Sequence, residues 1–235
     1  MSKEHVFSRS IFEPGRGDIA VQGMVNMPDG SIGGDWPKAR ILCAHHNSAL
    51  SPLDSEAKKL ADGLRKGLAG SGQTVVHLSG VLLERWVLKT VINQMVSGLG
   101  SQEKWKPAPQ WVQIAFGRAL MPPGLGLYSL RVENYLPHSN EQAMVTPAWS
   151  RQLEPPGPAQ LMGATVYFHG AAFFLLLNAM FLDALKLGRV PPGNSALPIT
   201  FDRLKYHPIG THTQDGQGRT TTARLDWGSP VGSPS

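Results

Sequence analysis

The chain has 235 residues, of which 17% are charged, and it contains 26 glycines, 19 prolines and one cysteine. This length allows one large domain or two small ones, the glycines and prolines predict many turns, and a single cysteine excludes an intrachain disulfide framework. A net charge of +5 with a pI of about 9.5 favours a polyanionic partner such as DNA, and the absence of an apolar stretch in the first residues argues against secretion, so we expect a cytoplasmic protein.

Two short segments near the N-terminus combine residue types that bind metal ions and transfer protons. Glu4 and His5 place a carboxylate beside an imidazole, and Cys43 and His46 form a Cys-x-x-His pair directly before Asn47. Thiolate sulfur and imidazole nitrogen suit zinc, whereas carboxylate and amide oxygens suit a harder cation such as Mg²⁺. The two segments therefore read as the two halves of a metal-dependent site.

In this order the residues resemble those of the HNH (His-Me finger) endonucleases. The family's pattern is a zinc-ligand pair, then Asp/Glu-His, then a strand that ends in Cys-x-x-Cys or Cys-x-x-His followed by Asn or His, and the resemblance covers the first quarter of the chain. It implies a hairpin whose first strand carries His5 and whose second strand, residues 40–43, leads into a helix with Asn47 near its start. It also implies that His5 is the general base and that Glu4 and Asn47 hold Mg²⁺ or Mn²⁺.

The chain departs from the family's pattern in two places. Lys38 stands where the family often has an asparagine that orients the base, and a lysine cannot accept the imidazole N–H. No Cys-x-x-Cys precedes Glu4, so Cys43 and His46 are interpreted as the remnant of a zinc site that needs four ligands. We therefore expect a truncated or decayed module that binds zinc weakly, and the sequence leaves open whether the module is catalytic.

The predicted module covers residues 1–70. Residues 13–37 are rich in Gly, Asp and Pro and are expected to form a loop or short hairpin. Residues 51–54 have the pattern of a capping box with proline at the first helical position, and helix formers follow. The alternative to cation binding for Asn47 is that it forms a turn in which its side chain hydrogen-bonds to the neighbouring backbone. His45 is interpreted as a solvated surface residue.

Residues 71–122 are predicted to be helical. Ser79 is the expected N-cap of a helix over residues 80–97, and a shorter helix is expected over residues 110–120, before Pro122 stops it. The longer helix has an apolar row and a polar row at helical spacing. The apolar row is Leu83, Val87, Val91 and Met95, and the polar row is Arg85, Lys89 and Asn93.

Residues 123–228 are predicted to form an antiparallel β region, followed by a disordered tail over residues 229–235. Strands are expected over residues 128–133, 164–168, 173–177, 199–201 and 220–227. The second and third of these strands would form a hairpin around His169-Gly170. The uncharged span 155–182 is also long enough for a membrane helix, but the prolines, glycines and an asparagine that interrupt it favour the hairpin.

The sequence thus predicts an α+β protein with an N-terminal ββα-metal (HNH-like) remnant, a helical middle segment and a C-terminal antiparallel β region. The favoured function is metal-dependent hydrolysis of DNA phosphodiester bonds, with RNA as the alternative substrate and no small-molecule cofactor. Two other functions stay open: a non-catalytic nucleic-acid-binding protein, and a small membrane-associated protein built around residues 155–187. The oligomeric state is not predicted.

Overall fold

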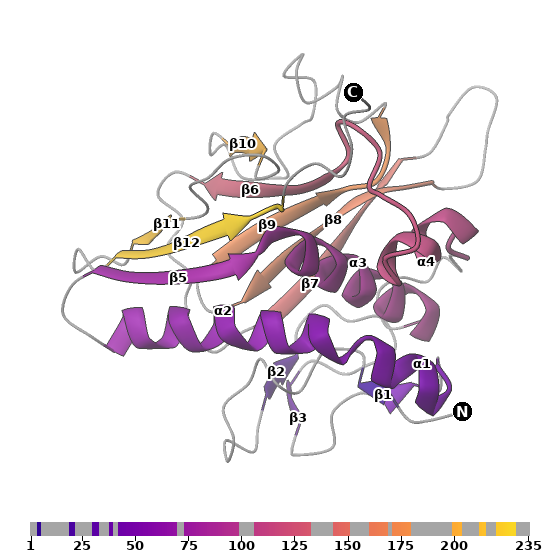
Figure 1. The fold of residues 1–235 in the computed structure, drawn as a ribbon, viewed down its shortest axis with the longest axis horizontal. Helices are drawn as coiled ribbons and strands as arrows, with labels where there is room; N and C mark the ends of the chain where they lie inside the picture. The colour runs from indigo at the N-terminus through magenta and orange to yellow at the C-terminus, as the bar shows by residue number, and fades with distance from the viewer. Residues whose placement is uncertain are drawn as a thin grey trace.

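The computed structural model describes thirteen stretches of the chain, within which helices and small sheets form an α+β fold, as predicted (Figure 1). The described residues are 4–5, 19–21, 30–32, 38–39, 42–69, 73–98, 106–132, 143–150, 160–168, 171–179, 199–203, 212–214 and 220–228. Side-chain surroundings are described for residues 42–67, 73–98, 106–128, 160–166, 173–179 and 221–228. The predicted tail, residues 229–235, lies outside these ranges.

Two consecutive helices follow the first short strands. They are α1 (Ala44–Ala49) and α2 (Ser51–Ala69), separated by Leu50, whose side chain is buried. Ser51 was expected to precede the helix as its cap, but it is the first residue of α2. Its hydroxyl donates a hydrogen bond to the Ser48 carbonyl at 2.7 Å. The apolar residues of α2 recur at helical spacing and face the core. They are Leu53, Ala57, Leu60, Ala61 and Leu64.

The helix α3 (Gly80–Ser97) confirms the predicted bounds and cap. The Ser79 hydroxyl accepts the Leu82 N–H at 3.3 Å, and Gly98 ends the helix with a φ of 76°. The predicted apolar row is buried, but so are Lys89 and Asn93 of the polar row. The helix is enclosed because it contacts α2, the next helix α4 (Pro109–Ala115) and strands of both larger sheets (Figure 1).

The helix α4 is shorter than the predicted 110–120. It ends at Ala115 because Phe116 closes the last turn and Gly117 adopts a φ of 71°, which no helix can continue. The Arg85 side chain holds this end in place: its Nε donates to the Ala115 carbonyl at 3.1 Å. Burial lowers the pKa of Arg85, and its positive charge stabilises the carbonyl end of α4.

The larger sheet has five antiparallel strands in the order β10-β6-β9-β8-β7. The strands are β6 (Gly126–Val132), β7 (Ala143–Ser150), β8 (Gln160–Phe168), β9 (Ala171–Leu176) and β10 (Ile199–Arg203). Phe168 pairs with Ala171, which confirms the predicted hairpin, whereas β7 was not predicted. Pro147 lies in β7 because an edge strand tolerates a residue without an N–H.

The hairpin also decides between the two interpretations of the uncharged span 155–182. The described residues 160–168 and 171–176 are paired strands, so the membrane helix is wrong for them. Among all described residues, no helix is both long enough and apolar enough to cross a bilayer.

The second sheet has three strands in the order β11-β12-β5 and corrects two expectations. Its strands are β5 (Gln73–Ser79), β11 (His212–Gln214) and β12 (Thr220–Asp226). Residues 73–79 therefore form a strand, and the prediction that they belong to a helical segment is wrong. In addition, β12 pairs in parallel with β5 along its whole length, so the C-terminal β region is not purely antiparallel. Parallel pairing needs a long connection, and α3 begins directly after β5.

The helix α2 packs closely on this second sheet (Figure 1). A Cβ atom at Gly63 would lie 2.1 Å from Val76 Cγ2, and one at Gly67 would lie 1.8 Å from Thr221 Oγ1. Glycine is therefore required at both positions for this close approach. The contact fixes α2 against the parallel strands and positions the residues that line their carboxyl ends.

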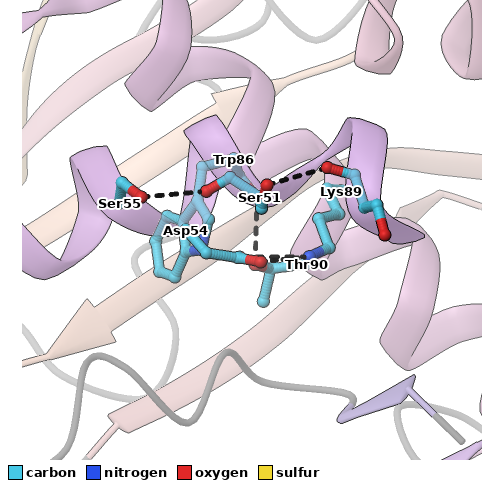
Figure 2. A network of polar contacts seen from close by, with 7 residues as sticks. Ser51, Asp54, Ser55, Trp86, Lys89 and Thr90 are labelled. Carbon is cyan, nitrogen blue, oxygen red and sulfur yellow. Dashed lines mark hydrogen bonds and ion pairs between the residues drawn. The ribbon is translucent and has the colours of Figure 1, made fainter. Parts of the chain in front are cut away.

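Two buried residues of α3, Lys89 and Glu84, bond to neighbouring elements. Figure 2 shows Lys89 of α3 reaching Asp54 of α2, with Nζ at 3.0 Å and 2.9 Å from the two carboxylate oxygens. Glu84, which is buried on α3, accepts the Leu127 N–H of β6 at 3.0 Å. These bonds tie α3 to α2 on one side and to the larger sheet on the other.

Two short strand pairs complete the described fold. The strands β2 (Ile19–Val21) and β3 (Gly30–Ile32) pair in antiparallel fashion, as expected for a short hairpin within residues 13–37. The strands β1 (Glu4–His5) and β4 (Lys38–Ala39) also pair in antiparallel fashion. Along the chain, β4 precedes α1, so a paired strand leads toward the helix that bears Asn47.

Candidate functional site

The first predicted half of the metal site lies on β1, which pairs with β4. Glu4 lies opposite Ala39 and His5 lies opposite Lys38. The second strand, β4, ends at Ala39. The prediction of a strand over residues 40–43 is therefore wrong for the two of these residues that the structure describes, Leu42 and Cys43, and Cys43 is the extended N-cap of α1. The side chains of Glu4 and His5 lie outside the residues whose surroundings are described, so their convergence with Asn47 stays a prediction.

Cys43 and His46 lie in contact at the start of α1. The Cys43 Sγ is 3.1 Å from the His46 Nδ1, as the prediction that the pair are neighbours requires. The contact follows from local geometry, because an N-cap residue and the third residue of its helix face each other across the first turn. Both side chains are exposed. The pair thus presents one sulfur and one nitrogen ligand on the surface.

An aromatic contact joins His46 to the end of α4. The rings of His46 and Phe116 meet edge to face, with centroids 5.3 Å apart and an interplanar angle of 74°. Phe116 is in turn covered by the Arg118 guanidinium, 5.8 Å from the ring centroid. The Phe116 ring thus contacts both His46 and the Arg118 cation. These contacts were not predicted, because Phe116 is far from His46 along the chain.

Asn47 lies inside α1, with its backbone N–H bonded to the Cys43 carbonyl at 3.0 Å. Its backbone is therefore helical, and the turn-forming alternative is wrong. The side chain is half-buried, and within the described part of the chain its amide makes no hydrogen bond. His45, by contrast, is exposed, as predicted, and meets the His46 ring edge to face at 5.6 Å.

Zinc coordination is not completed by the residues that the structure describes. A structural zinc ion takes four ligands, and Cys43 with His46 supplies two. No cluster of three or more His, Cys, Asp or Glu side chains exists among the described residues. The described residues therefore do not fit a closed zinc site.

A second candidate site was not anticipated from the sequence. A cavity of about 670 Å³ lies where the parallel strands β5 and β12 end and α3 begins. Its polar lining comes from α2, β5 and β12 and consists of Glu56, Lys59, His77, Ser79, Arg224 and Asp226. Only the pairing of β5 with β12 creates the cavity, and no local feature of residues 73–79 indicates that pairing.

Glu56 organises one wall of this cavity. It is only 4% exposed, and its Oε1 accepts the Ser79 N–H at 2.5 Å while its Oε2 accepts from Lys59 at 2.9 Å. A carboxylate at this position also interacts favourably with the positive end of α3. Glu56 is therefore fully engaged within the protein and fixes α2 to the end of β5.

Comparison with protein-family models, with curated proteins and with solved structures gives no match for this chain.

Proposed function

We propose that the chain is a metal-dependent endonuclease of the HNH type that hydrolyses DNA phosphodiester bonds. The observation that carries the proposal is the pairing of β1 with β4, because it brings the strand of Glu4 and His5 beside the segment that leads into α1. The contact between Cys43 and His46 adds support, since the HNH pattern requires these two residues to be neighbours.

In this proposal His5 is the general base. An imidazole can remove a proton from water near neutral pH, and the resulting hydroxide forms a bond to phosphorus while the bond from phosphorus to one sugar oxygen breaks. That sugar oxygen leaves and takes up a proton from solvent. Lys38, the strand partner of His5, cannot accept the imidazole N–H, so a backbone carbonyl or another side chain has to orient the ring.

Glu4 and Asn47 would hold the divalent cation. The donor set fits Mg²⁺ or Mn²⁺, because carboxylate and amide oxygens are the ligands that these ions prefer. The Asn47 amide is half-buried and makes no hydrogen bond within the described residues, so its oxygen is available. When bound, the cation would offset the negative charge that develops on the phosphate.

The alternative is a nucleic-acid-binding protein without catalysis. It is favoured by the arrangement of Arg118 over Phe116 beside His46, since a cation and rings near the surface suit the phosphates and bases of a strand. The net charge of +5 agrees with both functions.

Supercoiled plasmid DNA separates the two functions. Incubation with Mg²⁺ or Mn²⁺ should convert the plasmid to the nicked form, and excess EDTA should stop the conversion. Asn47→Ala should slow nicking because it removes an oxygen ligand, whereas His45→Ala, on the same helix, should not. Retention of the plasmid on a gel without nicking at any metal concentration would favour the binding function. Equal nicking in EDTA would contradict the proposed role of the cation.

A further inference from the structure

The cavity at the carboxyl ends of β5 and β12 lies where open sheets with parallel strands bind their ligands. At this edge the strands present residues in register: Arg224 of β12 lies beside His77 of β5, and Asp226 lies beside Ser79. A volume of about 670 Å³ is within the range of small-molecule sites and much larger than a single ion needs.

The charged side chains of the cavity indicate whether its ligand is an anion or a cation. Glu56 is buried and accepts from Ser79 and Lys59, whereas the Asp226 carboxylate is exposed and its Oδ1 accepts the Gly228 N–H at 2.8 Å. Arg224 and His77 are exposed and make no side-chain hydrogen bond or ion pair within the described part of the chain. The Arg224 guanidinium and the His77 imidazole therefore lie side by side on neighbouring strands, and the guanidinium favours an anionic ligand.

The Arg224 guanidinium indicates which kind of anion the cavity binds. Its planar set of N–H donors matches the oxygens of a phosphate group, which it can bind through two parallel hydrogen bonds. The imidazole of His77, on the neighbouring strand, would meet the same group. Leu82, which is partly exposed, also lines the cavity and can cover a less polar part of the ligand.

We propose that this cavity binds a nucleoside monophosphate, with its phosphate group on Arg224 and His77. The proposal does not depend on the nuclease function, because it uses none of the residues of the β1, β4 and α1 segments. A mononucleotide combines a phosphate that Arg224 and His77 can bind with a sugar and base of a size that the remaining volume accepts.

Isothermal titration calorimetry on the full chain at low ionic strength tests the proposal. The probes are the four common nucleoside 5′-monophosphates, the matching nucleosides without phosphate, and a single-stranded DNA oligonucleotide without terminal phosphates. At least one monophosphate should bind in a one-to-one ratio, and its nucleoside should bind at least about tenfold more weakly, because charged hydrogen bonds contribute that much.

Three variants assign the binding to the cavity. Arg224→Ala should weaken monophosphate binding by about tenfold or more, and Arg224→Lys should recover part of the loss because it keeps the charge but not the paired donors. Lys66→Ala removes another exposed positive charge, on α2 and outside the cavity, and should change the affinity by less than about twofold. Arg224 is exposed, so the variants should fold, which thermal unfolding would verify.

Three outcomes would overturn the proposal. The first is that none of the four monophosphates binds at millimolar concentration. The second is that the Arg224 and Lys66 variants lose the same amount of affinity for the monophosphate. The third is that only the oligonucleotide binds and that its binding depends on Arg224.

Discussion

Lys89 of α3 and Asp54 of α2 form an ion pair in which the ammonium group is almost completely enclosed. The Lys89 side chain is 4% exposed and that of Asp54 is 26% exposed, and Nζ lies 2.9 Å from the nearer carboxylate oxygen. A cation held this far from water is stable only while its charge is compensated. The pair therefore couples the folding of α2 to that of α3.

Asp54→Ala should accordingly destabilise the protein strongly. It leaves the Lys89 ammonium enclosed without this carboxylate, and breaking such a pair costs about 3 kcal/mol of unfolding free energy. Urea unfolding followed by circular dichroism measures the change. Lys58→Ala is the control, because it breaks the exposed pair with Asp62 and should cost less than about 1 kcal/mol. Similar losses in the two variants would contradict the role assigned to Lys89.

The second prediction concerns Gly126, the first residue of β6. Its φ is 113°, and a Cβ atom there would lie 2.1 Å from the Glu84 Oε2 that accepts the Leu127 N–H. Gly126→Ala should therefore add a steric clash to backbone strain, at a combined cost of about 3 kcal/mol or more. The free energy of unfolding, measured with urea, tests this value.

Gly98→Ala provides the matched comparison. Gly98 has a φ of 76°, but a Cβ atom there would meet nothing within 4 Å. This variant should cost only the strain of a left-handed residue, about 1 kcal/mol. If Gly98→Ala were as damaging as Gly126→Ala, the contact with Glu84 would not be the cause of the larger loss.

Zinc binding tests the interpretation of Cys43 and His46 as a remnant. Two ligands hold zinc far more weakly than the four of a closed site, whose binding free energy in small zinc domains is about 10–16 kcal/mol. Competition with a chromogenic chelator should therefore remove zinc from the chain readily, and Cys43→Ser should weaken the residual binding further. Tight one-to-one binding would show that other residues complete the site.

The elements that the sequence predicted well are those with local signals. Ser79 precedes an apolar row with helical spacing, and the helix begins and ends where the pattern indicates. The hairpin of β8 and β9 was predicted for the same reason, since its two apolar runs are neighbours in the chain. A capped helix and a hairpin between neighbouring strands both depend on residues that are close together in the chain, so they can be predicted from the sequence alone.

The features that were missed depend on residues far apart in the chain. β5 was assigned to a helical segment because its neighbours on both sides are helical, and nothing near residues 73–79 indicates their pairing with residues 220–226. The cavity with Arg224 and His77 exists only through that pairing. The contact of Cys43 with His46 was predictable from spacing, whereas the packing of His46 on Phe116 depends on how α4 docks beside α3.

The most direct test of the nuclease proposal is the rate of plasmid nicking by His5→Ala, compared with the wild-type chain and with His45→Ala under the same Mg²⁺ or Mn²⁺ concentration. A positioned general base contributes about 10²-fold or more, so the His5 variant should nick at least that much more slowly, while the His45 variant keeps the wild-type rate. Wild-type nicking by the His5 variant would contradict the assignment of His5 as the base and, with it, the HNH-type mechanism.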